Sequence, residues 1–84
     1  MTACALVFRS VHDVLKAEAR TKERGFATRL IPVPKQINPD CGLALQVACG
    51  DLAAVEGLLA DMRERLQGAY RLDGAAFTPL EPAL

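Results

Sequence analysis

"GLALQVA", residues 42–48, is the stretch that decides the fold, because nearly every one of its positions is apolar. A strand with one solvated face alternates apolar and polar residues, whereas a strand covered on both faces is apolar almost throughout. We therefore expect residues 42–48 to form a central strand of a sheet.

The sequence on either side predicts three more strands and two helices. Strands are expected at residues 3–9, 26–33 and 69–72, and helices at residues 10–25 and 50–68. Ser10 is a suitable N-cap, because its hydroxyl can accept a hydrogen bond from a free amide at the start of the first helix. The second helix carries an apolar stripe at helical spacing, made up of Leu52, Val55, Leu59, Met62 and Leu66.

The order strand, helix, strand, strand, helix, strand predicts an α+β fold, the ferredoxin-like βαββαβ sandwich. It consists of a four-stranded antiparallel sheet with two helices on one face. Right-handed crossovers place strand 42–48 between strands 3–9 and 26–33. Strand 69–72 then pairs with the free side of strand 3–9.

Residues 1–72 are expected to form this single ferredoxin-like domain, and residues 73–84, which include two prolines, an extended C-terminal tail. Alternation along the strands places small apolar residues on the face away from the helices, namely Ala3, Ala5, Ala44 and Ala48. Such a face could pack against the tail or against a second copy of the chain. A homodimer and a monomer with a covered face both stay open.

The composition argues against several classes of function. Ten basic and ten acidic side chains cancel, and aromatic residues make up only 5%, so a basic, stacking surface for nucleic acid is not expected. No apolar run approaches the roughly 18 residues that span a membrane. The N-terminus lacks the leading positive region of a signal peptide. We therefore predict a cytoplasmic protein whose three cysteines are free thiols.

Cys41 is the candidate for chemistry, since the expected topology puts it at the sheet edge where the first helix begins. The partial positive charge of a helix N-terminus stabilises a thiolate. His12 and Lys35 would add positive charge there, and Gly42 would let another molecule approach the sulfur. Asp40 works in the opposite direction, because a neighbouring carboxylate disfavours a thiolate. The alternative is that Cys41 is a small buried hydrophobic residue.

Cys4 and Cys49 are expected at the opposite edge, on neighbouring antiparallel strands. A disulfide between them is geometrically feasible, but a reducing compartment predicts two free cysteines with a structural role. About seven extended residues, over roughly 20 Å, separate them from Cys41. Cys41 would then lack a resolving partner, which argues against a dithiol oxidoreductase. The sequence offers no zinc ligand set and no phosphate-binding glycine loop, so no metal and no cofactor are expected.

Three motifs resemble the small bacterial domains described as selenium/sulfur carrier-like proteins. They are F-x-S-x-H-D-x-L-K-A-E at 8–18, R-L-I-P-x-P at 29–34 and C-G-L-A-L at 41–45. The resemblance covers about residues 3–72. It implies that Cys41 holds a persulfide or selenide-type species and passes it on, and it matches Ser10 and His12 to the start of the first helix. It also matches Arg29, Pro32 and Pro34 to the exit of the second strand. The approach "INPD" departs from the family, whose members tend to have small hydroxyl residues there.

The sequence and the resemblance together predict a sulfur or selenium carrier, not a stand-alone enzyme, with sulfur or selenium donor and acceptor proteins as its partners. Cys41 is the expected carrier thiol, and the residues expected around its cargo are Gly42, Ser10, His12, Arg29 and Lys35. The alternative is a non-catalytic ferredoxin-like binding or regulatory module that acts through its open sheet face as an oligomer. An enzyme built on a Cys41–His12 pair is disfavoured, because the chain offers no third residue to orient the pair.

Overall fold

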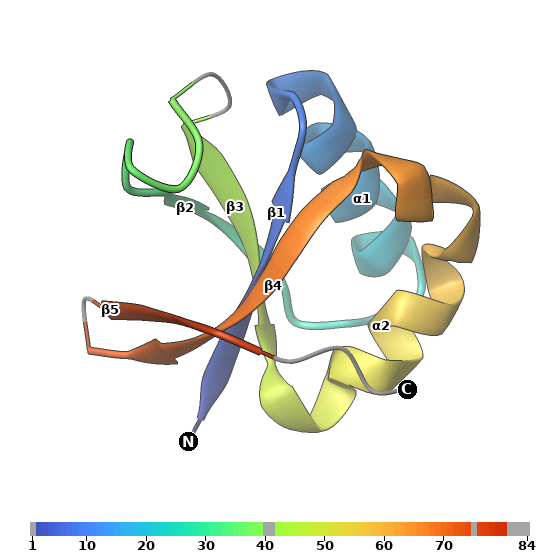
Figure 1. The fold of residues 1–84 in the computed structure, drawn as a ribbon. Coiled ribbons are helices and arrows are strands. Elements are labelled where there is room, and N and C mark those ends of the chain that lie inside the picture. Colours follow the sequence, from blue (N-terminus) through green and yellow to red (C-terminus); the bar gives the residue numbers. More distant parts are fainter. Residues whose placement is uncertain (1, 40–41, 75, 81–84) are drawn as a thin grey trace.

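Five antiparallel strands form one sheet in the order β2-β3-β1-β4-β5, and the helices cover one of its faces (Figure 1). The structure is a computed structural model that describes residues 2–39, 42–74 and 76–80. The elements along the chain are β1 (Ala3–Phe8), α1 (Val11–Glu23), β2 (Arg29–Pro32), β3 (Leu43–Ala48), η1 (Cys49–Asp51), α2 (Leu52–Leu58), η2 (Ala60–Arg65), β4 (Leu66–Asp73) and β5 (Ala76–Pro79). The predicted α+β class is confirmed. Within the described ranges, no helix is long and apolar enough to cross a membrane.

The neighbours expected for the first four strands are those of the structure. β3 lies between β2 and β1, with Leu45 paired to Leu30 on one side and to Leu6 on the other. β1 pairs in turn with β4. Leu45 has no exposed surface, so β3 is the buried central strand that its apolar sequence predicts.

The expectation of four strands is wrong, because part of the expected tail forms a fifth strand. β5 pairs with β4, and Phe77 lies opposite Leu72. Gly74 adopts φ +62° at the end of β4, a left-handed conformation that glycine reaches without steric cost. The rings of Tyr70 and Phe77 meet edge to face, with 5.9 Å between their centroids. Contacts with β4 thus hold β5 in the sheet, although the prolines of this segment had suggested an extended tail.

Helix α1 agrees with its prediction. Ser10 is the N-cap, and its Oγ accepts a hydrogen bond from the Asp13 amide at 3.2 Å. Gly25, just beyond the C-terminal end, has φ +83°. The N-cap Ser10 and the glycine Gly25 therefore indicated where this helix begins and ends.

The second helix is shorter than predicted. α2 ends at Leu58, and the chain continues as the 3-10 helix η2 until β4 begins at Leu66. Leu66 pairs with Phe8 of β1, so the chain has to be extended where the helix was expected to continue. Leu59 and Met62 still reach the core, at 5% and 4% exposure. The apolar stripe thus predicted which side chains are buried there, but not the tighter helix that buries them.

The sheet separates two apolar clusters, because alternate residues of β1 face opposite sides. For the side away from the helices, the sequence left packing against the tail and packing against a second copy both open. Ala5 and Ala44 on that side have no exposed surface. They belong to a cluster with Val33, against which Ile37 and Phe77 pack. The chain covers much of this face itself, with its 33–39 loop and β5.

Candidate functional site

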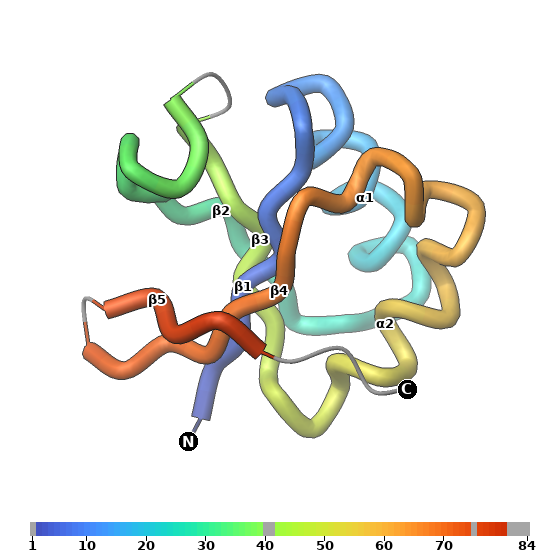
Figure 2. Tube along the Cα trace, in the orientation of Figure 1, coloured from blue at the N-terminus to red at the C-terminus, as the bar shows by residue number. Residues whose placement is uncertain are grey.

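Four segments meet at one edge of the sheet, which we call the helix-start edge. They are the end of β1, the first turn of α1, the loop of residues 33–39, and the start of β4, all at the top of Figures 1 and 2. Strand pairing brings them together, since Val7 near the end of β1 faces Ala44 near the start of β3. Gly42, directly before β3, and Ser10 therefore lie at the same edge, as the topology predicted. Asp40 and Cys41 lie outside the described residues.

The loop of residues 33–39 is fastened to the sheet at both ends. The amide of Val33 donates to the carbonyl oxygen of Gly42 at 3.1 Å. Asn38 is only 3% exposed, and its Nδ2 donates to the carbonyl oxygen of Phe8 at 2.8 Å and to Gln67 Oε1 at 2.7 Å. Asn38 stands where the family was expected to have small hydroxyl residues. Its side chain anchors the loop to β1 and β4, a role that no local sequence pattern indicates.

Asp13 connects the start of α1 to η2. Its Oδ2 accepts hydrogen bonds from Ser10 Oγ at 2.8 Å and from Arg65 Nε at 2.9 Å. The Arg65 guanidinium first, and the Ser10 hydroxyl second, lower the pKa of the Asp13 carboxyl below its ordinary value. The sequence suggested only a favourable charge at the helix start. Asp13 is in fact the centre of a polar network that holds the helix-start edge together.

Gly42 leaves the space beside it open. The residue is exposed, and apart from its two chain neighbours no atom of the described residues lies within 4 Å of the position that a Cβ atom would take. Its φ of +74° falls in the left-handed region that favours glycine. Its conformation, and not the lack of room, is therefore what requires a glycine next to Cys41.

The other expected site residues are not all in one place. His12 is exposed in the first turn of α1, and Lys35 is exposed in the loop, so both belong to the helix-start edge. Arg29 is exposed at the opposite end of β2, where it pairs with Gln46. Three strand residues, about 10 Å, separate it from the end of β2 that adjoins the loop.

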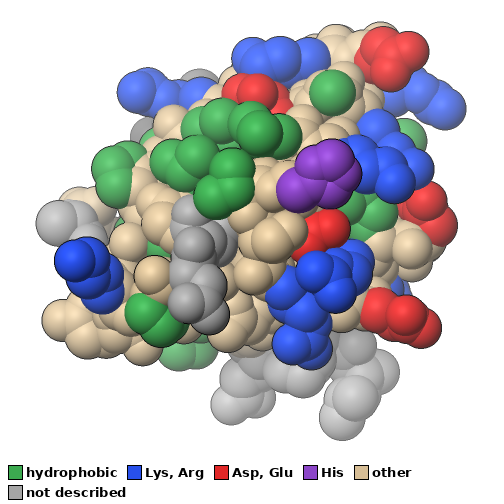
Figure 3. Space-filling view, turned by 90° about the horizontal axis from the view of Figure 1, so that it is seen from above, with side chains coloured by type: hydrophobic (Ala, Val, Ile, Leu, Met, Phe, Trp, Pro, Cys, Tyr) green, Lys and Arg blue, Asp and Glu red, His purple; other side chains and the backbone are tan. Residues whose placement is uncertain are grey.

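The helix-start edge is partly apolar and partly basic. Figure 3 looks down on it and shows hydrophobic side chains next to the histidine, with Lys and Arg side chains beyond. Val11 and Leu15, one turn apart on α1, are large hydrophobic residues with 37% and 44% of their surface exposed. Lys16 is exposed next to them. A chain with no net charge thus presents an apolar stripe with basic neighbours at this edge.

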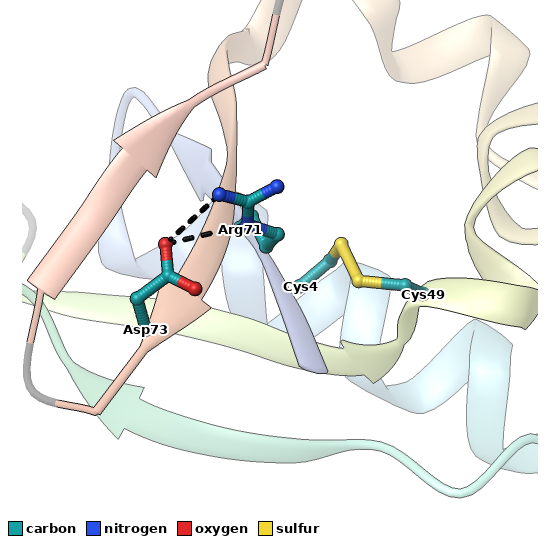
Figure 4. The surroundings of a disulfide bond; sticks show 4 residues. All are labelled: Cys4, Cys49, Arg71 and Asp73. Atoms are coloured by element: carbon teal, nitrogen blue, oxygen red, sulfur yellow. Dashed lines mark hydrogen bonds and ion pairs between the residues drawn. A yellow bond between two sulfur atoms is a disulfide. The ribbon is translucent and has the colours of Figure 1, made fainter. Parts of the chain in front are cut away.

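Cys4 and Cys49 form a disulfide at the opposite end of the sheet (Figure 4). Their Cα atoms are 5.1 Å apart, which confirms that the start of β1 and the end of β3 bring them together. The prediction that both are free thiols is wrong. It rested on the compartment, whereas the geometry favours the bond. Cys41 is the one cysteine of the three that takes no part in this disulfide.

In the part of the chain that the structure describes, no three His, Cys, Asp or Glu side chains are grouped so that they could hold a metal ion. Comparison with known families gives one match. The model of the family described as "Putative Se/S carrier protein-like" matches residues 3–71, from β1 into β4. No curated protein and no solved structure matches the chain.

Proposed function

The chain belongs to the Se/S carrier protein-like family, and on this premise we propose that Cys41 carries sulfur or selenium as a persulfide or selenide-type species. An acceptor protein receives the cargo. The observation that carries the proposal is the family match, which runs through the Cys-Gly pair at 41–42 and over most of the chain.

The proposed sulfur step is an exchange between two thiols. The Cys41 thiolate attacks the outer sulfur of a donor persulfide, the sulfur–sulfur bond of the donor breaks, and the donor leaves as a thiolate. Delivery repeats the exchange with Cys41 as the donor. Neither step needs a net oxidant or reductant, so the carrier has to supply access and stabilisation of a thiolate, while its partners form and use the persulfide.

Three features of the helix-start edge support this role. Gly42 is exposed and has open space beside it, so a second protein can approach the helix-start edge there. The hydrogen bonds of Asn38 hold the preceding loop against the sheet, which limits its freedom and pre-organises the position. The N-terminus of α1, a helix of 13 residues, lies at the same edge and favours negative charge.

The exposed surface of α1 is suited to bind a partner protein with an acidic surface. Val11 and Leu15 offer apolar contact area, and Arg9, His12 and Lys16 surround them with donors that are exposed to solvent. A donor or acceptor protein with carboxylates around a small apolar patch would complement this surface and be guided to the edge that carries the cargo.

The alternative function, a binding or regulatory module that acts as an oligomer, has less support. It relied on small apolar residues at an open sheet face, yet Ala5 and Ala44 are fully buried within the chain. A groove of about 460 Å³ remains on that side between the 31–34 segment and β5, with Leu72 and Phe77 in its walls. Sedimentation over a range of concentrations distinguishes the two functions. A stable dimer that Phe77→Ser disrupts would favour the module, and a monomer throughout would exclude it.

Loading followed by mass spectrometry tests the carrier function. The protein is incubated with a persulfide donor, such as a cysteine desulfurase with its cysteine substrate, and its intact mass is recorded. We expect the addition of one sulfur atom to the wild-type chain and none to Cys41→Ser. Equal loading of the two proteins, or no loading of either by a persulfide or perselenide donor, would overturn the proposal.

A further inference from the structure

The Cys4–Cys49 disulfide is a second sulfur centre, separate from the helix-start edge. Cys4 belongs to β1 and is only 2% exposed, whereas Cys49 begins η1 and is partly exposed. β3 runs between Cys49 and Gly42, and its six residues extend over about 20 Å. The two centres therefore cannot exchange sulfur within one molecule in this fold.

We propose that the Cys4–Cys49 disulfide is a site of thiol–disulfide exchange, at which an external thiol attacks Cys49 and Cys4 is the leaving group. Access decides which sulfur is attacked, because a thiolate has to approach along the line of the sulfur–sulfur bond. The 2% exposure of Cys4 closes that approach from its side. Cys49 is partly exposed, and the exposed Gly50 that follows it adds no side chain there.

Arg71 favours Cys4 as the leaving group. It is the direct partner of Cys4 on the neighbouring strand β4, so both side chains extend from the same face of the sheet. Figure 4 shows Arg71 beside Cys4, with its guanidinium bonded to Asp73 Oδ2 at 3.3 Å. A cation on the residue opposite Cys4 favours the negative charge that develops on the Cys4 sulfur when the disulfide opens, and the ion pair of Arg71 with Asp73 offsets part of this effect.

The exchange balances with two equivalents of a monothiol or one dithiol protein as reductant. The first thiolate forms a mixed disulfide with Cys49 and releases the Cys4 thiolate, which takes up a proton. A second thiolate attacks the external sulfur of the mixed disulfide and releases the Cys49 thiolate. The disulfide gains two electrons, and the two external thiols become one disulfide.

Reduction would free the segment that follows Cys49. η1 contains no buried residue, and Val55 is the one buried residue of α2. Besides the disulfide, the amide of Cys49 donates to the carbonyl oxygen of Thr2 at 3.1 Å. The disulfide is thus the covalent tie between η1 and β1, whereas Leu52, Val55 and Leu58 attach α2 to the core through apolar contacts. Disulfides that external thiols can reach are commonly the labile or regulatory ones, and the partly exposed Cys49 gives this bond such access.

Two matched variants test the direction of attack, both in the Cys41→Ser background. Cys4→Ala leaves the Cys49 thiol, and Cys49→Ala leaves the Cys4 thiol. We expect iodoacetamide to alkylate Cys49 at least about tenfold faster than Cys4 in folded protein. Equal rates, or a faster Cys4, would overturn the proposal. If either variant fails to fold, the mixed disulfide with glutathione is mapped in Cys41→Ser itself, where attachment to Cys49 supports the proposal and attachment to Cys4 overturns it.

The rate of reduction by glutathione tests the part played by Arg71. Arg71→Gln should slow the release of Cys4 by about threefold, and Arg71→Lys should restore most of the rate. Arg63→Gln removes the same charge near the other end of β4 and should leave the rate unchanged. An unchanged rate in Arg71→Gln would show that Arg71 plays no part in the exchange.

Hydrogen exchange tests the consequence for η1 and α2. On reduction of the Cys41→Ser protein, we expect amides of residues 49–58 to exchange at least about tenfold faster while those of β1 and β3 stay protected. Unchanged protection of residues 49–58, or an equal loss over the whole sheet, would contradict a local tether.

Discussion

Asp13 and Arg65 are 52 positions apart in the sequence, yet Asp13 Oδ2 accepts a hydrogen bond from Arg65 Nε at 2.9 Å. The contact joins the first turn of α1 to the end of η2, directly before β4. It also fixes the carboxylate that engages the hydroxyl of the N-cap, Ser10. The geometry of the helix-start edge depends on this pair.

Asp13→Asn should change how stability depends on pH. Arg65 and Ser10 lower the pKa of Asp13 in the folded state, so its stabilising effect is present above the unfolded pKa of about 3.9 and is lost as the pH falls through the folded value. Thermal unfolding should therefore show the wild-type chain losing more stability than Asp13→Asn on going from pH 6 to below about pH 4. Asp61 and Asp73, whose pKa values are also lowered, are common to both proteins.

Glu64→Gln is the control for Asp13→Asn, because it removes an exposed carboxylate close by in the chain. It should keep the wild-type pH profile. If Asp13→Asn and the wild-type chain have parallel profiles, the ion pair with Arg65 does not stabilise the fold.

Asn38→Ala should destabilise the fold by about 1–3 kcal/mol, because it leaves the carbonyl oxygen of Phe8 without a buried donor. Urea unfolding measures the change. Gln36→Ala, at an exposed position of the same loop, should stay within about 0.5 kcal/mol of the wild-type chain. Equal effects of the two substitutions would mean that the Asn38 side chain does not anchor the loop.

Gly42→Ala should cost about 1–2 kcal/mol, because alanine at φ +74° adopts a left-handed conformation. Gly50→Ala is a matched control, since the space beside Gly50 is also open but its φ is not in that region. Chemical denaturation should show a near-neutral effect at position 50. A near-neutral effect at position 42 as well would show that its backbone is free to change conformation.

Breaking the Cys4–Cys49 disulfide should lower the free energy of unfolding by about 4 kcal/mol, as expected for a bond between residues separated by 45 positions. Denaturant titrations of Cys41→Ser with and without reductant measure this difference. The same titrations of Cys4→Ala/Cys49→Ala should no longer respond to reductant. An unchanged midpoint for the parent protein would mean that the disulfide does not form in solution.

Lys16→Glu should slow transfer from a donor protein by about tenfold at low salt, while loading from a small persulfide stays unchanged. The substitution reverses a charge next to Val11 and Leu15, the apolar stripe of the proposed docking surface. Arg24→Glu makes the same change at the opposite end of α1 and should have little effect. The rates of transfer are measured by quenching the reactions at successive times and recording intact masses. Equal slowing by both variants would indicate a general charge effect without a docking site.

Local patterns allowed the prediction of most of the sheet and of α1. The apolar run of β3 depends only on its own residues, and so does the cap of Ser10 on α1. β5 was not predicted because its stability comes from contacts with β4, such as that of Tyr70 with Phe77. No local sequence pattern indicates these contacts. The 3-10 helix η2 was not predicted for a similar reason, because the pairing of Leu66 with Phe8 ends the helical segment early.

Where the topology alone decides, the placement of residues in the fold agrees with the prediction. The order of the strands was enough to place Gly42 and Ser10 at one edge and to bring Cys4 near Cys49. The contacts of Asn38 and Asp13 depend on partners about 30 to 50 positions away, and a single sequence has no signal for such pairs. The disulfide between Cys4 and Cys49 depends on the distance between the two residues in the fold, which cannot be inferred from the composition of the chain.

β3 separates the Cys4–Cys49 disulfide from the helix-start edge, where the proposed carrier function places its cargo. Gly42 precedes its first residue and Cys49 follows its last, and the strand is fixed on both sides by β2 and β1. A cargo at one end cannot be discharged by thiols at the other end of the same molecule. If both proposals hold, each centre has to be served by its own partner molecule, and thiol–disulfide exchange and sulfur or selenium supply act on this protein as two independent inputs.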